Sequence, residues 1–480
     1  MTFFESETYS LARIGLQRGI GLVLLIAFLN AVNQFRPLLG DRGLLPASLF
    51  VKQVPFRASP SLFYLFPNDT AFATAAWLGV FLSCLAITGL SERLAPWISV
   101  VAWAMLWTLY ISFVNVGQDF YAFGWESILL EACFYAVFLG SRATTPQTIV
   151  IWLFRWLLFR VMFGAGLIKL RGDPCWRDLT CLNYYYETQP LPNPPSWYFH
   201  VAPAWTHSAG VVFNHFAELI VPFGYLLPQP ISSIAGLITI AFQGTIFLSG
   251  NLSWLNFLTM ILAISTFDDR ALSRLGFTPA PAEQASGLTI HRIIAIGLAI
   301  LVAVLSVQPI RNMLSPGQIM NTVYNRLHLV GTYGAFGSIT RPRYEVIIEG
   351  TDEAILTPST KWREYEFKGK PGNTGRQPPQ VAPYHLRLDW LMWFAALSSY
   401  NQQPWFVPFL AKLLEGDRPT LDLLASNPFP NSPPRYVRAQ LYEYHFTTPE
   451  ERAASGQWWR REFIRPYFPP MSFDNGKARY

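Results

Sequence analysis

The residues of this sequence that could carry chemistry are ionisable side chains inside long apolar segments. Glu126 and Glu131 interrupt one such segment, and Arg155 and Arg160 interrupt the next, with the same spacing of five and opposite charge. Ionisable groups in hydrocarbon are costly and usually face the interior of a helix bundle, where they pair. The pattern therefore predicts intramembrane ion pairs among Glu126, Glu131, Arg155 and Arg160.

A second group contains Lys169, His215 and Glu218. His215 and Glu218 are three residues apart and share a helix face, where they could form a structural pair, relay protons or bind a metal. Lys169 ends the preceding apolar segment. It could extend to the membrane interface, or a desolvated Lys169 could act as a base. The sequence leaves these interpretations open.

The cysteines divide into two pairs by their surroundings. Cys84 and Cys133 lie in apolar segments, whereas Cys175 and Cys181 lie together in a polar stretch. In an oxidising compartment the second pair could close a small disulfide, provided that the chain bends between the two residues. A structural disulfide is predicted, and a redox-active pair is the alternative. Two cysteines without further ligands do not form a zinc site, so no metal is predicted.

The elements that position these residues are predicted to be membrane-spanning helices. The chain is 51% hydrophobic and only 14% charged, whereas soluble proteins have about 25% charged residues. A span needs roughly 20 apolar residues. Nine segments are candidates: residues 14–32, 71–90, 95–114, 122–139, 149–170, 210–227, 231–250, 252–267 and 290–307. The seventh and eighth nearly merge at Gly250-Asn251, so a multi-pass α-helical bundle of eight or nine spans is predicted.

The distribution of Lys and Arg predicts the orientation of the bundle. Short loops with Arg93, Arg142 and Arg270 are predicted to be cytoplasmic, because the loops near residues 118–119 and 250–251 contain no Lys or Arg. With nine spans, the outer loop 170–208 and the C-terminal part share the non-cytoplasmic side; eight spans would place the C-terminal part in the cytoplasm. Residues 1–10 show no signal-peptide pattern, so the first helix is predicted to remain as an anchor.

Charged residues become dense after about residue 310, which predicts a domain boundary. Residues 1–309 form the predicted membrane domain, and residues 310–480 a soluble, extracytoplasmic α+β domain rich in β-structure. Its predicted strands are 333–339, 344–350, 362–368, 436–446 and 458–465; its predicted helices are 386–398, 404–414 and 420–426, with an irregular tail from Pro466. Residues 310–480 hold 20 Lys and Arg and 15 Asp and Glu, and this net charge of +5 without a Lys/Arg-rich run fits anionic headgroups or an acidic partner and argues against nucleic acid.

Long stretches of unusual composition carry a family resemblance. They are GAGLIKLRGDPCWRDLTC at 164–181, LNYYYETQPLPNP at 182–194, SWYFH at 196–200, NHF at 214–216, HLVGTYGAFG at 328–337, WREYEFK at 362–368, PYHLRLDW at 383–390 and WWRR at 458–461. Together they resemble the lipase maturation factor family and cover both predicted domains. One departure is Gly331, where the family pattern has Asn.

The resemblance implies a chaperone-like maturation factor without a cofactor, rather than an enzyme. Animal members of the family sit in the endoplasmic reticulum membrane with the soluble domain in the lumen, and they help secreted dimeric lipases reach their active state. In a bacterium the corresponding place is the inner membrane. The implied partners are the lipid bilayer and a secreted client protein, a lipase by resemblance.

Aromatic and charged side chains of the resembling stretches are candidates for client binding, since Trp and Tyr combine large apolar faces with polar tips. The same side chains could instead anchor the loop at the membrane interface. The candidates are Trp176, Arg177, Asp178, Tyr184, Trp197, Tyr333 and Phe336.

A shorter stretch, GLIKL at 166–170 followed by a Trp, resembles the vitamin K-dependent carboxylase. It implies an alternative function, a quinone-linked membrane enzyme in which Lys169 is the base and His215 or Glu218 assists. A transporter is a third class, which no clear inverted repeat of Gly- or Pro-broken spans supports.

Overall fold

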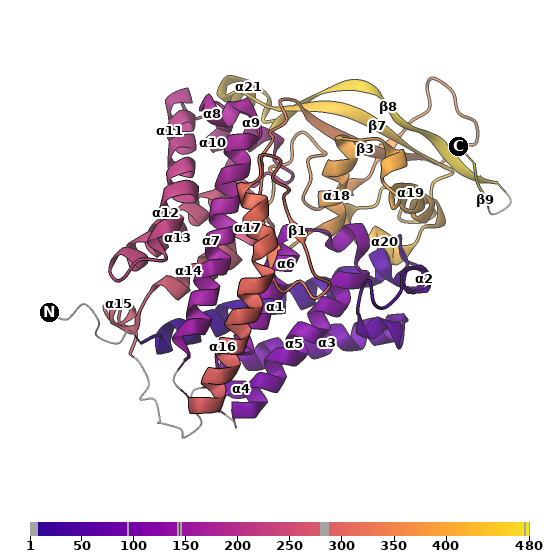
Figure 1. The fold of residues 1–480 in the computed structure, drawn as a ribbon. Helices are drawn as coiled ribbons and strands as arrows, with labels where there is room; N and C mark the ends of the chain where they lie inside the picture. Colours follow the sequence, from indigo (N-terminus) through magenta and orange to yellow (C-terminus); the bar gives the residue numbers. More distant parts are fainter. Residues whose placement is uncertain are drawn as a thin grey trace.

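The computed structural model describes residues 8–93, 96–141, 144, 146–278, 288–474 and 477–479. A bundle of helices occupies the N-terminal part of the chain, and an antiparallel sheet with covering helices occupies the C-terminal part (Figure 1). Two predictions fall partly outside the described residues: the absence of a signal peptide, which concerns residues 1–7, and the cytoplasmic position of Arg142.

Among the residues that the structure describes, six helical segments are long and apolar enough to cross a membrane. An apolar run of this length forms a helix in lipid because the helix satisfies its own backbone hydrogen bonds. The six are α1 (Ser10–Leu39), α3 (Asp69–Thr88), α5 (Pro96–Val116), α7 (Thr148–Arg171), α13 (Ile231–Ser249) and the segment Ile290–Leu314, which contains most of α16 (Leu288–Leu305) and α17 (Val307–Leu314).

The other three predicted spans are also helical, but they are short or interrupted. Helix α6 (Gly124–Ala136) has 13 residues, and α14 (Leu255–Ala263) continues as the 3-10 turn η4 (Ile264–Thr266). The sixth predicted span consists of α11 (Ala204–His215), a π-helical turn η3 (Phe216–Ile220) and α12 (Val221–Gly224). The predicted helical bundle is therefore confirmed, with α13 and α14 as separate helices.

The connections between helices gather at two ends of the bundle. At one end, Arg13 donates to the Ser141 carbonyl (2.6 Å) and Arg18 to Glu92 (2.8 Å), so the start of α1 meets α4 (Leu90–Arg93) and the segment that follows α6. Helix α15 (Asp269–Ser273) also packs on α1 there. These segments contain the predicted cytoplasmic loops. The loop after α7 and the sheet lie together at the opposite end, the upper one in Figure 1.

The sheet of the C-terminal part has the strand order β4-β3-β7-β8-β9 and is antiparallel. Its long strands are β3 (Arg343–Thr351), β7 (Tyr436–Phe446) and β8 (Trp459–Asp474), and its edges are β4 (Arg363–Glu364) and β9 (Lys477–Arg479). The register of β3 and β7 runs from Arg343 opposite Tyr444 to Thr351 opposite Tyr436. Helix α18 (Arg387–Ala396) packs on β3, and α19 (Phe406–Glu415) on β7 and β8.

Short elements complete the chain. They are α2 (Ala47–Gln53), η1 (Leu62–Tyr64), η2 (Gln118–Tyr121), β1 (Thr322–Val323), β2 (Gly331–Thr332), β5 (Glu366–Phe367), η5 (Tyr400–Gln402), α20 (Arg418–Leu421), β6 (Leu424–Ser426) and α21 (Pro449–Ser455).

The predicted elements of the C-terminal part are only partly correct. The strands 344–350 and 436–446 and the helices 386–398 and 404–414 are confirmed by β3, β7, α18 and α19. The predicted irregular tail from Pro466 is wrong, because β8 continues to Asp474 through register shifts against β7 that accommodate the proline residues.

Three further predictions differ from the structure. Residues 333–339 are not a strand, because they lie against α7 so closely that a Cβ on Gly172 would meet the Gly337 carbonyl oxygen at 2.0 Å. Residues 362–368 form β4 and β5, which belong to different sheets. Residues 420–426 end helix α20 and then form β6, which pairs with β5.

Candidate functional site

The outer loop after α7 folds into three short helices, α8 (Pro174–Arg177), α9 (Leu182–Thr188) and α10 (Ser196–His200). The Asp173 side chain accepts a hydrogen bond from the Cys175 N–H (3.0 Å) and caps α8, with Pro174 at its first position. Helix α8 ends after four residues, and the chain turns so that Cys175 and Cys181 form a disulfide, with Cα atoms 4.8 Å apart. Both cysteines are buried.

Arg343 on β3 binds the outer loop to the sheet. Its guanidinium donates to the carbonyl oxygens of Glu187 (2.7 Å), Gln189 and Pro190 (3.1 Å), and it pairs with Glu345 at 2.5 Å. The side chains of Arg343 and Glu345 are completely buried. Charge-assisted hydrogen bonds of this kind are the strong ones, so the end of α9 is fixed to the C-terminal domain.

Asn251, between α13 and α14, joins three segments. Its Nδ2 donates to the carbonyls of Pro192 (3.0 Å) and Pro379 (2.9 Å). Its Oδ1 accepts from the backbone N–H groups of Val381 and Ala382, both at 2.8 Å. One buried amide therefore satisfies backbone groups of the outer loop and of the C-terminal domain at the same place.

Three of the predicted client-binding residues are buried in the seam between these parts. Trp176 Nε1 donates to the Phe336 carbonyl (2.9 Å), Trp197 Nε1 to the Thr447 carbonyl (2.8 Å), and the Tyr333 hydroxyl to Glu131 (2.7 Å). Because their polar atoms and rings are used within the molecule, Trp176, Trp197 and Tyr333 hold the seam together and offer no free surface.

The remaining candidates are more accessible. Arg177 and Asp178 are exposed on α8 and just after it. Tyr184 is half-buried with the Arg341 guanidinium 4.6 Å from its ring centroid, and Phe336 is half-buried against Tyr185.

The candidates leave out the two most exposed aromatic side chains of this region. Tyr198 is 55% exposed on α10, and Trp205 is 72% exposed in the first turn of α11. In a five-residue helix no periodicity distinguishes an exposed Tyr198 from a buried Trp197, so the sequence contains no signal for this difference.

A cluster of titratable groups lies where the loop meets strand β7. Glu187 accepts from His445 Nδ1 (2.9 Å) and lies 3.1 Å from His200 Nε2, while His445 Nε2 is 3.1 Å from Glu443. The hydrogen bond to Glu187 raises the pKa of His445, although burial opposes this. Burial acts to raise the pKa of Glu187, but hydrogen bonds from His200 and His445 outweigh it, so that pKa is lowered.

The predicted intramembrane pairs are present only in part. Glu131 on α6 and Arg160 on α7 form a buried ion pair. Glu126 pairs instead with Arg387 of the C-terminal domain at 2.7 Å. Within the described residues, the hydrogen bonds of Arg155 go to the carbonyls of Ser265 and Tyr225 and to the Tyr9 hydroxyl, and to no carboxylate.

The pairing of Glu126 with Arg155 is excluded by helix direction. Helices α6 and α7 follow each other and run antiparallel. Glu126 lies five residues before Glu131, and Arg155 five residues before Arg160. On antiparallel helices these two steps point in opposite directions along the common axis. With Glu131 facing Arg160, Glu126 and Arg155 are therefore about 15 Å apart along the axes.

Lys169, Asn214 and Glu218 form a buried polar cluster. The Lys169 ammonium donates to Asn214 Oδ1 (2.8 Å) and to both Glu218 carboxylate oxygens (2.7 and 2.8 Å). All three of its hydrogens therefore have acceptors. The π-helical turn places Glu218 in this cluster, whereas His215 Nε2 lies 2.9 Å from the Trp176 carbonyl and contributes nothing to it.

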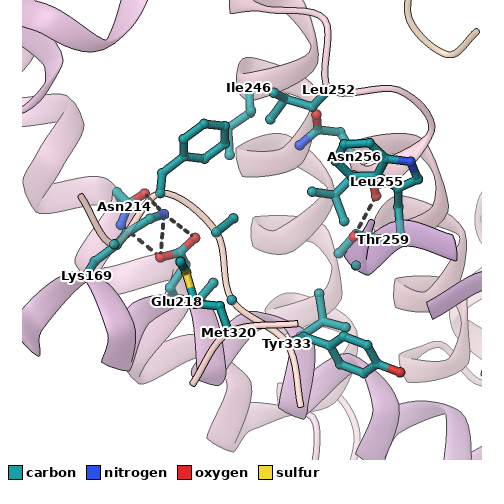
Figure 2. A pocket seen from close by; sticks show the side chains of 18 of the residues that line it. Lys169, Asn214, Glu218, Ile246, Leu252, Leu255, Asn256, Thr259, Met320 and Tyr333 are labelled. Atoms are coloured by element: carbon teal, nitrogen blue, oxygen red, sulfur yellow. Dashed lines mark hydrogen bonds and ion pairs between the residues drawn. The ribbon is translucent and has the colours of Figure 1, made fainter. Parts of the chain in front are cut away.

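This cluster forms one wall of a cavity of about 390 Å³. Figure 2 shows Lys169, Asn214 and Glu218 on one side of the cavity, and Asn256 and Thr259 across from them. The remaining lining is mostly apolar and comes from α6, α7, α11, α13, α14, α18, the outer loop and residues 333–338. The cavity therefore lies where the membrane helices meet the C-terminal domain.

One group of possible metal ligands occurs among the described residues, namely Asp173, Cys175 and Cys181. The two sulfurs are bonded to each other, and the Asp173 carboxylate caps α8 and pairs with Arg341 at 2.9 Å. The hydrogen bond from Arg341 lowers the pKa of Asp173 to about 2. This group is committed to structure and does not offer a metal site.

Comparisons with known proteins match both parts of the chain. Residues 11–274 match the family model described as the lipase maturation factor transmembrane domain, and residues 329–469 the one described as the lipase maturation factor C-terminal domain. The chain is 43% identical to mouse lipase maturation factor 1, over 99% of this chain and 90% of that protein. It is 44% identical to human lipase maturation factor 1, over 98% and 89%, and 28% identical to human lipase maturation factor 2, over 95% and 82%. No solved structure matches it. These comparisons give no support to the carboxylase alternative.

Proposed function

The chain belongs to the lipase maturation factor family, and from this premise we propose that it is a membrane-embedded maturation factor for secreted proteins, with a lipase as its client. The relatives are named for lipase maturation, which supports the class of client. The six helical segments of the described chain that are long and apolar enough to cross a membrane support an integral, multi-pass membrane protein.

The observation that carries the proposal is a pair of exposed aromatic side chains on a rigid support. Tyr198 and Trp205 are exposed in the last part of the outer loop, and the Arg452 guanidinium of the C-terminal domain lies 5.7 Å from the Tyr198 ring centroid. Tyr198 sits on α10, which the buried Trp197 fixes to the Thr447 carbonyl of the C-terminal domain. Exposed Trp and Tyr side chains are typical binding anchors for apolar surface of a partner.

The support matters because a partly folded client binds more tightly to a surface that is already ordered. Arg343 and Asn251 fix the outer loop to the sheet through buried hydrogen bonds, and the disulfide closes its first turn. The binding surface therefore loses little conformational entropy when a client is bound. We place this surface on the extracytoplasmic side, in the endoplasmic reticulum lumen or the periplasm, because the opposite end holds the connecting segments with Arg93 and Arg270.

Site-specific photocrosslinking tests the proposal directly. A photoactivatable phenylalanine analogue is placed at Tyr198 or at Trp205 in the full-length protein, and the protein is expressed in membranes together with a secreted dimeric lipase. We expect both positions to capture the lipase during its maturation. Trp77, an aromatic residue of α3 that is 57% exposed, is the matched control and is expected to capture lipid but not lipase.

The result separates client binding from membrane anchoring. Capture of the lipase at Tyr198 or Trp205 but not at Trp77 supports the proposal. Capture of lipid alone at all three positions would show that the loop lies on the bilayer, and the proposed client surface would be wrong.

A further inference from the structure

The cavity beside Lys169 has features of a ligand site, and the proposed client-binding residues Tyr198 and Trp205 do not line it. A volume of about 390 Å³ falls in the range of roughly 300–1,000 Å³ that small-molecule sites occupy. Such sites are mostly apolar and contain a few placed polar groups. Here the apolar lining includes Met162 of α7, Phe242 of α13 and Trp390 of α18.

Two polar atoms in the lining lack hydrogen-bond partners among the described residues. One is the Asn256 Oδ1 acceptor, and the other is the Trp125 Nε1 donor; both residues are more than nine-tenths buried. Asn256 uses its Nδ2 to donate to Gln243 Oε1 at 2.6 Å. Buried polar groups are almost always satisfied, so each such atom requires an explanation, and a bound molecule that both donates and accepts hydrogen bonds supplies one.

The opposite wall restricts the charge of such a molecule. Lys169 and Glu218 neutralise each other, and Asn214 bonds to both of them. A ligand with a net charge would have to break this pair and leave one buried charge without a partner, which is strongly unfavourable. The site therefore favours an uncharged head group.

The position of the cavity between two membrane helices indicates that its ligand comes from the bilayer. Gly210 and Phe213 of α11 and Thr245 and Ile246 of α13 line it, so it lies between these two helices of the membrane domain. Phe213 and Thr245 are also exposed on the outer surface of the bundle. Helix α13 packs on α12 and η3 at the other end of the pair. Beside the cavity, the two helices approach each other through the rings of Phe213 and Phe242, whose centroids are 5.6 Å apart.

We propose that this cavity binds a membrane lipid with an uncharged, hydroxyl-bearing head, of the acylglycerol class. The acyl chain lies along the apolar lining and leaves between α11 and α13. The glycerol hydroxyl donates to Asn256 Oδ1, and an oxygen of the same head accepts from Trp125 Nε1. Lys169, Asn214 and Glu218 form the polar wall that the head group faces.

Photolabelling of the full-length protein in lipid nanodiscs tests this assignment. The probe is a monoacylglycerol with a diazirine in its acyl chain, and labelled residues are identified by mass spectrometry. We expect labels on the cavity lining, at Met162 and Phe242, which excess unlabelled monoacylglycerol prevents. Thr245→Trp places a large ring at the opening and is expected to reduce this labelling by about tenfold. Ala241→Trp, one turn away on the same helix and outside the lining, is the matched control and is expected to leave it unchanged.

Two further measurements separate the head group from the chain. Asn256→Leu removes the acceptor and is expected to weaken competition by monoacylglycerol by about tenfold, the effect of one lost hydrogen bond, without changing labelling by an alkane diazirine. Equal labelling of the cavity in Thr245→Trp and the wild type would overturn the proposal. So would stronger labelling by the corresponding fatty acid or phosphatidic acid, since both are anionic. Thermal melting of each variant identifies a folding defect. If Thr245→Trp does not fold, Gly210→Leu, which enlarges a lining residue on α11, replaces it.

Discussion

Single buried polar side chains connect the two parts of this protein, and Arg343 shows what each of them contributes. Its guanidinium is the partner of three carbonyl oxygens of the outer loop and of Glu345. Glu345 also forms an ion pair with Lys370 at 2.9 Å, so this carboxylate keeps a partner when Arg343 is lost. The carbonyl oxygens of the loop lose the hydrogen-bond donor that Arg343 supplies.

The first prediction concerns the stability of this connection. Arg343→Met is expected to lower the free energy of unfolding by about 3–5 kcal/mol, because three buried carbonyl oxygens of the outer loop lose their charged hydrogen-bond donor. Arg343→Lys keeps the charge but loses the fork geometry, so its effect should be intermediate. Thermal melting of the purified protein measures both variants.

The control is an ion pair at the surface. Arg363 and Asp352 are 2.8 Å apart and both exposed. Asp352→Asn should therefore change the stability by less than about 1 kcal/mol. If Arg343→Met melts like Asp352→Asn, the connection between loop and sheet does not depend on Arg343.

The second prediction concerns pH at the contact of Glu187 with His445. A histidine whose pKa is raised by folding stabilises the fold below its unfolded pKa of 6.5, and this contribution is lost as the pH rises through the folded value. A glutamate whose pKa is lowered stabilises the fold above 4.5, and its contribution is lost as the pH falls through the folded value. The contact is therefore strongest between pH 4.5 and 6.5.

Limited proteolysis of the outer loop at several pH values measures this contact. Cleavage in the wild type should be slower at pH 6 than at pH 8.5. In His445→Gln the difference between the two pH values should shrink, because residue 445 no longer titrates. An unchanged difference would place the titrating group elsewhere.

Among the elements, the outer loop depends most on a covalent bond. The disulfide closes a short segment around α8, and its sulfurs are buried among Trp176 and Tyr185. Thiol–disulfide exchange requires access to a sulfur, so burial favours a structural bond over a redox-active pair. Loop closure of this length stabilises by about 2 kcal/mol in the chain-entropy model.

The third prediction follows from this burial. Denatured protein kept without reductant should accept two thiol labels, on Cys84 and Cys133, and reduced denatured protein should accept four. Cys175→Ser combined with Cys181→Ser should speed proteolysis of the loop without preventing insertion into the membrane. Four labels without reductant would show that the bond does not form.

The helices of the membrane domain show which features of the site the sequence can predict and which it cannot. Apolar runs predict the nine segments proposed as spans, all of which are helical, because their signal lies within each segment. They do not predict the short helices α2, α4 and α15, or α17 beyond the last predicted span. Which charged side chains pair with each other depends instead on how the helices pack. The equal spacing of Glu126 and Glu131 and of Arg155 and Arg160 predicts two ion pairs, but antiparallel helices allow only one. Glu126 is satisfied by Arg387, which is 261 residues away, and no local pattern announces that contact.

The same distinction applies to the aromatic side chains. Composition predicts that residues 176–205 are rich in rings, but only packing decides that Trp176 and Trp197 are buried while Tyr198 and Trp205 are exposed. The Lys169 and Glu218 contact was within reach of the sequence, since both lie in apolar segments. The contact of Lys169 with Asn214 rather than His215 was not, because His215 and Asn214 are both within one helical turn of Glu218 and only packing decides which of them faces Lys169.

At the scale of the whole molecule, the fourth prediction is its orientation in the membrane. In sealed vesicles with the cytoplasmic face outward, tags at Pro203 and at the C-terminus should resist added protease, and a tag at Gly276 should be cleaved. Pro203 and Gly276 are both exposed, so access to each tag depends on the side of the membrane. Cleavage of the C-terminal tag with protection at Pro203 would indicate an even number of crossings.

The long-range contacts of Asn251 and Arg343 also fix an order of events during synthesis. Arg343 donates to the carbonyl of Glu187, which lies 156 residues earlier in the chain, and Asn251 accepts from the amide of Ala382, which lies 131 residues later. A ribosome therefore delivers the whole outer loop to the membrane well before the strands that order it exist. A premature stop codon beyond the last membrane helix would leave every loop residue translated and the loop itself unformed.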